Sequence, residues 1–309
     1  MKLGIVGAGF AGEIIAYTAA LRGLCDRISF VDINEKKAHA QAMDINDARS
    51  YYPHDLFADS CQYEDLRDAD IIVLTSGGIP DSPDRLDEFK VNKNIMIDYT
   101  KRIVSAGFKG IFIVVSNPCD VMAYLVYKTS SFNPKRVIGA GTALDSSRLK
   151  TILSNKFDIS AKSISAIVMG EHGENQFIPW SQVRIAGMPF ERYMEMYKNS
   201  FKDFDKKKIE DEVRKRGWDI YLGKSCTQYG IANTITKIIS AIINNENIAL
   251  NVSTLLNGEY SLKNIYLSTP CSINKDGINK IFELDLSVSE LRKLKEAANV
   301  LNAYNKLLD

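Results

Sequence analysis

The stretch Gly7-Ala8-Gly9-Phe10-Ala11-Gly12 decides the fold of this chain. It follows a short apolar run at residues 3–6 and precedes a helical pattern, so its G-x-G-x-x-G spacing lies between a strand and a helix. In that context Gly7 permits a tight turn, Gly9 lets backbone N–H groups approach a pyrophosphate, and Gly12 lets the helix pack closely on the strand. The helix N-terminus then faces the phosphates. The segment therefore predicts a dinucleotide-binding turn, whereas the same spacing elsewhere would indicate only a glycine-rich turn.

Short apolar, β-branched runs alternate with helical patterns through the first half of the chain. Amphipathic helices are predicted at residues 13–23 and 89–106, and strands at residues 3–6, 28–32, 70–75, 111–116 and 137–140. Continuous apolar runs joined by helical crossovers are typical of parallel strands that are buried on both faces. The pattern predicts an α/β fold, in which a Rossmann-type doubly wound parallel sheet is followed by an α+β substrate domain.

Asp32 ends the second predicted strand, twenty residues after Gly12 (32 − 12). A carboxylate at this place accepts hydrogen bonds from the adenosine ribose hydroxyls and repels a 2′-phosphate. We therefore expect the first part of the chain to bind NAD rather than NADP.

The composition narrows the possible partners and compartments. The 309 residues include 39 Lys and Arg against 38 Asp and Glu, which gives no sign of a nucleic-acid or anionic-membrane partner. No segment reaches the roughly 20 apolar residues that span a bilayer, and the N-terminal apolar run is too short for a signal peptide. The five widely spaced cysteines indicate reduced thiols, so we expect a cytoplasmic protein. With only three histidines, no metal centre is expected.

Two short motifs supply candidate catalytic groups. Gly170-Glu171-His172-Gly173 presents an imidazole in a glycine bend at the end of an apolar run, as proton-transfer groups often are, although a lone histidine there is more often structural. Leu144-Asp145-Ser146-Ser147-Arg148 opens a helix and places a carboxylate and a guanidinium on one face. A routine intrahelical ion pair would have the same spacing.

Two further strand ends carry polar residues. Ser116-Asn117-Pro118 either presents an amide at the ligand-binding edge of the sheet or forms a turn. Thr75-Ser76-Gly77-Gly78 leads into residues 79–86, where two prolines precede Arg85. This segment is either a loop that closes over a ligand or an ordinary connection to the next helix.

Together and in this order, the motifs resemble those of the lactate/malate dehydrogenase superfamily over essentially the whole chain. Within it the chain is most similar to the L-lactate and L-2-hydroxyisocaproate dehydrogenases, and residues 171–177, Trp180-Ser181 and Asp84-Arg85-Leu86 resemble the latter branch. The resemblance implies an NAD-dependent L-2-hydroxy acid dehydrogenase that reduces a 2-oxo monocarboxylate. It also implies an NAD-binding domain at residues 1–143, a catalytic, substrate and oligomerisation domain at residues 144–309, and a homo-oligomer, with a tetramer favoured over a dimer.

The resemblance also implies catalytic roles. His172 would be the general acid/base at the C2 oxygen, with Asp145 orienting its ring and raising its pKa. Arg148 would bind the substrate carboxylate through a bidentate pair. Arg85 would polarise the substrate carbonyl from the closing loop.

Other candidate residues would bind the substrate or the cofactor. Asn117 would hydrogen-bond near the reacting oxygen, and Thr227 would form part of the pocket wall. The residues expected to bind NAD are Gly7, Gly9, Phe10, Ala11, Gly12, Asp32, Thr75, Gly77, Gly78, Ser116 and Asn117.

The substrate loop departs from the usual pattern of the family. Between Gly78 and Arg85 it is about two residues shorter, and Asp81-Ser82-Pro83-Asp84 stands where malate enzymes carry Arg and typical lactate enzymes carry Gln. Two acidic side chains there would repel a dicarboxylate, so we expect oxaloacetate to be a poor substrate. The shorter loop would also leave space for a substrate larger than pyruvate.

A second departure concerns activation by fructose 1,6-bisphosphate. Members of the family that respond to it carry a His seven residues before the catalytic one, where this chain has Ser165 (172 − 165), and Lys150 replaces a nearby Arg. A phosphate site with fewer or weaker cations binds poorly, so little activation is expected.

The second half of the sequence indicates mixed structure. Strands are predicted at residues 163–169 and 183–186, a charged, solvated helix at 205–216, and an apolar helix at 231–243 that is core or subunit contact. Ser287-Val288-Ser289-Glu290 is typical of a capping box that opens the last helix.

The sequence gives less support to three alternative functions. A malate dehydrogenase would need a cation in the loop. A non-catalytic NAD(H)-binding sensor would need neither His172 with Asp145 nor Arg85 with Arg148. An NAD-dependent glycosidase would need a metal site.

Overall fold

One large sheet organises the molecule. The computed structural model describes residues 1–77 and 85–308, with the side chains of residues 85–88 outside that description. The order of the strands in the sheet is β3-β2-β1-β4-β5-β6-β12-β13-β8-β9, and β14 pairs with β13. These strands are β1 (Lys2–Val6), β2 (Arg27–Val31), β3 (Phe57–Ser60), β4 (Ile71–Leu74), β5 (Ile111–Val114), β6 (Val137–Gly139), β8 (Met169–Gly170), β9 (Gln176–Phe177), β12 (Ile248–Asn257), β13 (Lys263–Asn274) and β14 (Gly277–Ile281).

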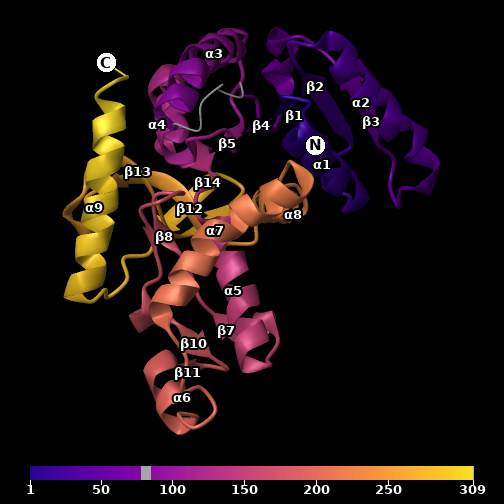
Figure 1. The fold of residues 1–309 in the computed structure, drawn as a ribbon. Helices are drawn as coiled ribbons and strands as arrows, with labels where there is room; N and C mark the ends of the chain where they lie inside the picture. Colours follow the sequence, from indigo (N-terminus) through magenta and orange to yellow (C-terminus); the bar gives the residue numbers. More distant parts are fainter. Residues whose placement is uncertain (78–84, 309) are drawn as a thin grey trace.

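Helices cover this sheet, and a small second sheet lies at the end of the molecule opposite the nucleotide-binding part (Figure 1). The second sheet has the order β11-β10-β7, from β7 (Ile164–Ser165), β10 (Arg184–Ile185) and β11 (Met188–Pro189). The helices are α1 (Phe10–Leu21), α2 (Glu35–Asp47), α3 (Arg85–Ser105), α4 (Cys119–Ser130), α5 (Ala143–Phe157), α6 (Phe190–Met196), α7 (Lys206–Lys224), α8 (Tyr229–Ile243) and α9 (Val288–Asn305).

The six strands β1 to β6 pair in parallel, with β1 between β2 and β4. Side chains of β1 pack on both faces of the sheet. Leu3 and Ile5 belong to the hydrophobic cluster on one face, and Val6 belongs to the cluster on the other. This is the arrangement of a sheet covered on both faces by crossover helices. The predicted fold class, a Rossmann-type sheet followed by further α/β structure, is confirmed.

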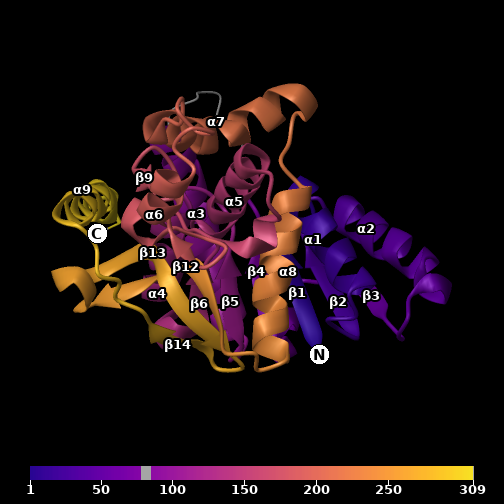
Figure 2. The same cartoon turned by 90° about the horizontal axis from the view of Figure 1, so that it is seen from below.

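The apolar helix predicted at 231–243 is α8. Of the two predicted roles, core or subunit contact, its isoleucines have the first. Ile235, Ile238, Ile239 and Ile242 are buried in the cluster that also contains Ile5. Figure 2 shows α8 running alongside α1, so a helix from the second half completes the packing of the nucleotide-binding half. The capping box that opens α9 is also confirmed, since Ser287 and Glu290 bond each other's backbone.

Several elements were not predicted from the sequence. These include α2 and β3, in which Ala58 is the one buried residue. They also include the long hairpin of β12 and β13, whose buried faces include Asn251, Ser253 and Ser268. Because these buried residues are polar, the hydrophobic alternation that signals a strand is interrupted there.

The single strand predicted at residues 163–169 is wrong. The chain pairs with β10 through β7, leaves that sheet, and joins β13 through β8. A continuous apolar run thus serves two sheets, which periodicity alone does not reveal. The charged helix predicted to end at residue 216 continues to Lys224 as α7.

Within the described residues, no helix combines the length and the apolar character that crossing a membrane requires.

Candidate active site

Four of the predicted nucleotide-binding residues meet at one edge of the sheet. Gly7, Asp32, Thr75 and Ser116 follow the carboxyl ends of parallel strands, which meet at the same edge. The Thr75 N–H donates to Val6 O at 2.8 Å, and the Thr75 hydroxyl donates to Gly7 O at 2.8 Å. These bonds tie the loop after β4 to the glycine turn.

The glycine turn has the geometry of a phosphate cradle. Gly7 has φ +101°, and a Cβ on Gly12 would lie 1.9 Å from Gly7 O, so both positions exclude a side chain. A Cβ on Gly9 would meet nothing within 4 Å, so the surface of the turn is open at this residue. Gly9 is also the N-cap of α1 and caps it without a side-chain hydrogen bond. N–H groups at a helix N-terminus attract anions, so the turn fits the pyrophosphate of NAD.

Asp32 is held beside this turn. One carboxylate oxygen accepts from the Ala8 N–H at 2.7 Å and the other from the Asn34 N–H at 2.8 Å. The carboxylate is thereby fixed at the end of β2, where the ribose of a dinucleotide on the turn would lie.

Two predicted catalytic residues, His172 and Asp145, lie together with Arg148, which was predicted to bind the substrate. The Nδ1 atom of His172 is 2.7 Å from Asp145 Oδ2, and Arg148 Nη1 is 2.9 Å from Asp145 Oδ1. The Asp145 side chain is 2% exposed and the His172 side chain 26%. Asp145 and Arg148 come from the first turns of α5, whereas His172 follows β8. A buried carboxylate therefore hydrogen-bonds both a partly exposed imidazole and a guanidinium.

The Asp145 carboxylate is kept ionised by its two partners. Burial disfavours its charge, but the charges and hydrogen bonds of His172 and Arg148 outweigh burial and hold the pKa of Asp145 below its usual value. An ionised Asp145 accepts from the Nδ1–H of His172, which fixes the tautomer of the ring with its other proton position at Nε2.

The structure describes only some of the other predicted site residues. Thr227 is half-buried between α7 and α8, and Asn117 is exposed at the end of β5. Gly77 lies beside Asn92 of α3, whose amide donates to Asn117 O at 3.2 Å. Gly78 and residues 81–84 lie outside the described residues. Arg85 is the first residue of α3, and its side chain is not described.

Two residues of the site were missed by the sequence analysis. A Cβ on Gly217 of α7 would lie 3.4 Å from the Arg148 guanidinium, so glycine lets this helix approach it closely. Asp120, three residues after Asn117, accepts a hydrogen bond from the His172 N–H at 2.8 Å. One signal for Asp120 was available, because it is the sole charged residue in the first nine of α4.

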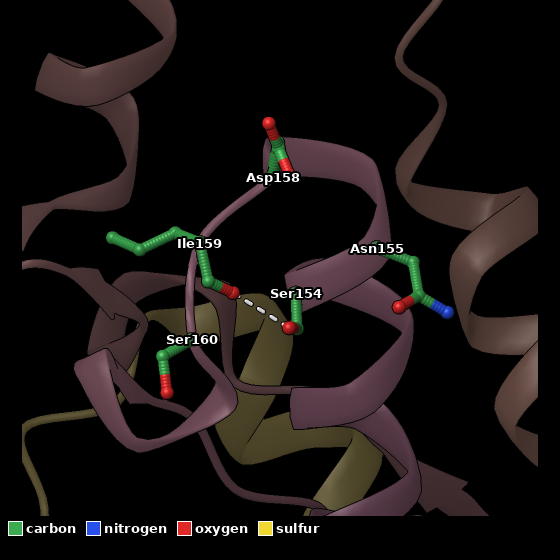
Figure 3. A pocket seen from close by; sticks show the side chains of 5 residues that line it. All are labelled: Ser154, Asn155, Asp158, Ile159 and Ser160. Atoms are coloured by element: carbon green, nitrogen blue, oxygen red, sulfur yellow. Dashed lines mark hydrogen bonds between the residues drawn. The ribbon is translucent and has the colours of Figure 1, made fainter.

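A shallow hollow at the far end of α5 is separate from this ensemble. It is lined by Ser154, Asn155, Asp158, Ile159 and Ser160, and the Ser154 hydroxyl donates to Ile159 O at 2.6 Å (Figure 3). It contains none of the predicted site residues, so the strand-end edge remains the candidate site.

Two family models together match nearly the whole chain. The model described as lactate/malate dehydrogenase, NAD binding domain, matches residues 1–139, and the lactate/malate dehydrogenase, alpha/beta C-terminal domain, matches residues 142–307. The chain belongs to the lactate/malate dehydrogenase family. As a member of this family it is an NAD-dependent oxidoreductase, and its cofactor is NAD.

Individual proteins named as lactate dehydrogenases match this chain over nearly their full length. The chain is 36% identical to L-lactate dehydrogenase 3 of Bacillus cereus, over 99% of this chain and 98% of the relative. It is 37% identical to the L-lactate dehydrogenase of Fusobacterium nucleatum, over 98% of this chain and 95% of the relative. The crystal structure of the minor L-lactate dehydrogenase from Enterococcus mundtii in its ligands-bound form matches with a TM-score of 0.95 at 32% identity, over 100% and 98% of the two chains.

Proposed function

We propose that this family member is an L-2-hydroxy acid dehydrogenase of the L-lactate dehydrogenase type, which reduces a 2-oxo monocarboxylate with NADH. The observation that carries the proposal is the His172–Asp145–Arg148 ensemble, in which a buried carboxylate bonds both a proton-transfer group and a carboxylate-binding group. The full-length relatives named L-lactate dehydrogenase support the substrate class.

In the proposed mechanism His172 transfers the proton and Asp145 holds it ready to do so. NADH, when bound, supplies the hydride that is added to C2 of the substrate. His172 donates a proton from Nε2 to the C2 oxygen, and takes it back in the reverse reaction. Asp145 orients the ring through Nδ1 and stabilises the imidazolium, which makes proton donation possible near neutral pH.

Arg148 anchors the substrate in this mechanism. A guanidinium has five N–H donors, so Arg148 can bind Asp145 through Nη1 and a substrate carboxylate through other donors. Holding the carboxylate fixes the distance of C2 from His172, and such positioning is a large part of catalysis. Gly217 supports this role because it keeps α7 from displacing the guanidinium.

Three further residues complete the proposed site. Arg85, at the start of α3, would polarise the carbonyl when the preceding loop closes. Asn117 would hydrogen-bond near the reacting oxygen and the nicotinamide, and Thr227 would line the pocket. In this proposal residues 1–143 bind NAD, and residues 144–309 form the substrate pocket and the subunit contacts.

The test is NADH consumption by the purified protein with pyruvate, 2-oxoisocaproate, phenylpyruvate and oxaloacetate. A monocarboxylate with the highest kcat/KM supports the proposal, and a bulky one indicates a pocket enlarged by the short loop. Preference for oxaloacetate would make the protein a malate dehydrogenase instead. If all four substrates fail while NADH still binds, the protein is an NAD(H)-binding sensor.

We also propose that the protein is a cytoplasmic homo-oligomer, with a tetramer favoured. Large apolar side chains are exposed at the end of α7 and the start of α8, where Trp218 is 56%, Leu222 79% and Tyr229 68% exposed. Patches of this kind are typical of subunit contacts. The five free cysteines are consistent with a reducing compartment. Light scattering during size-exclusion chromatography tests the assembly, and a monomer at micromolar concentration would contradict it.

A further inference from the structure

A second buried carboxylate holds the main chain of His172. Asp120 lies in the first turn of α4 and is 2% exposed. Its Oδ2 accepts from the backbone N–H of His172 at 2.8 Å, and its Oδ1 accepts from the Ser268 hydroxyl of β13 at 3.4 Å. Asp120 thus joins a helix of the nucleotide-binding half to the segment that carries the imidazole.

The two carboxylates around His172 have opposite environments. Asp145 bonds a ring nitrogen and a guanidinium, and its pKa is lowered. Burial raises the pKa of Asp120 to about 6, because the loss of water outweighs the stabilisation of the charged form by the nearby Ser253 hydroxyl and the His172 N–H, and the neighbouring Glu171 charge raises it further. Burying an ionised carboxylate among mostly neutral donors costs stability, so Asp120 does not hold this place by adding folding energy.

The backbone around His172 needs such a restraint. Gly170 has φ +96°, and a Cβ there would lie 2.7 Å from Asn175 O, so the bend requires glycine. Gly173 follows on the other side of His172, so the residue that carries the imidazole lies between two glycines, which restrict the backbone less than other residues do. Asp145 restrains the ring, but the ring can reach the substrate only if its main chain is fixed as well.

We propose that Asp120 is a positioning residue for His172, which fixes the backbone of the imidazole-bearing bend by accepting its N–H. The inference rests on the proposed function, because it assigns the fixed bend a purpose in proton transfer. A misplacement of about 1 Å in a reacting group can cost on the order of 100-fold in rate. Loss of the acceptor at residue 120 should therefore lower kcat without weakening NADH binding.

The experiment compares Asp120→Leu, which has similar size and no acceptor, with Asp120→Asn, which keeps an acceptor oxygen and loses the charge. Hydrogen–deuterium exchange of the peptide containing residues 170–177 reports on the His172 N–H without any need for activity. We expect exchange at this N–H to be slow in the wild type and Asp120→Asn, and at least about tenfold faster in Asp120→Leu.

The kinetic prediction distinguishes positioning from folding. Per NADH-binding site, kcat should fall by about 100-fold in Asp120→Leu and stay within about threefold of the wild type in Asp120→Asn at pH 8. A folded Asp120→Leu with normal exchange or normal kcat overturns the proposal, as does an equally large loss in Asp120→Asn. If thermal melting shows that Asp120→Leu is unfolded, Asp120→Ala takes its place with the same criteria. A wild type that reduces no 2-oxo acid would overturn the proposed function, whereas exchange at His172 would still test the role of Asp120 as its anchor.

Discussion

The nucleotide-binding edge and the His172 ensemble are built in different ways. At the edge, the groups proposed to bind the cofactor are backbone N–H groups of one short turn, and Gly7 and Gly12 shape this turn because neither position has room for a side chain. In the ensemble, the working groups are side chains that come from α4, α5 and the segment after β8. The first region is encoded locally, and the second exists only after the fold has formed.

Because the two regions are built differently, mutations in them should have different effects. A side chain added at the glycine turn should impair cofactor binding or folding and leave the ensemble intact. A side chain removed from the ensemble should impair proton transfer and leave cofactor binding intact. Mutations in the two regions should therefore have separable effects on cofactor binding and on turnover.

The substitution His172→Ala should have the largest effect. General acid–base catalysis contributes roughly 100- to 10,000-fold, so kcat for reduction of the best 2-oxo acid should fall by about this factor. The dissociation constant of NADH, measured by fluorescence titration, should change less than about twofold, because the ring lies outside the glycine turn. Turnover close to that of the wild type would remove His172 from the mechanism.

The glycine turn offers a matched pair of variants. The Cβ of Gly9→Ala meets nothing within 4 Å, so its melting temperature should match the wild type while NADH binds at least about tenfold more weakly. The Cβ of Gly12→Ala would lie 1.9 Å from Gly7 O, so this variant should lose stability, by about 1–3 kcal/mol. Equal NADH affinity of Gly9→Ala and the wild type would show that the open face of the turn is not where the cofactor binds.

The raised pKa of Asp120 predicts how stability depends on pH. Its folded value of about 6 lies above the ordinary 3.8, so the stability that this residue contributes is fully present below about pH 4 and is lost as pH rises through about 6. Asn at position 120 does not titrate. The free energy of unfolding of Asp120→Asn, relative to wild type, should therefore rise by roughly 2 kcal/mol from pH 4 to pH 7. Urea unfolding across this range measures the difference, and two parallel pH profiles would mean that Asp120 titrates normally.

The smallest expected effect concerns fructose 1,6-bisphosphate. Ser165 on β7 carries no charge, and Lys150 on α5 is partly buried and cannot form the bidentate pair of an arginine, so these two positions offer a phosphate dianion little. We expect the KM for the 2-oxo acid to change less than about twofold when the sugar phosphate is added. A large decrease in KM would reveal a cation site that these two residues do not supply.

The contrast between the two regions also explains what the sequence could predict. The glycine turn and Asp32 were identified by spacing alone, because the turn, the strand end and the helix start are consecutive in the chain. The buried polar residues of β12 and β13, such as Asn251 and Ser268, concealed two long strands from the apolar pattern.

The partners of His172 illustrate the limit within the site. The chemistry of His172, Asp145 and Arg148 was suggested by residue type and by family resemblance, and the structure adds the distances. Asp120 is 52 residues from His172 in sequence, and they meet where β13 pairs with β8 and packs against α4. The charge of Asp120 in an otherwise apolar helix start marked it as unusual. A contact between distant segments leaves no periodic signal, however, so the sequence could not identify the His172 N–H as its partner.

The central claim is that the charge of Asp145 holds His172 ready for proton transfer. Its most direct test is NADH oxidation by the wild type and Asp145→Asn with the best 2-oxo acid, measured side by side from pH 5 to pH 9. The account predicts that Asp145→Asn binds NADH normally and turns over roughly 100-fold more slowly or worse across the range. Turnover by Asp145→Asn within threefold of the wild type would contradict it.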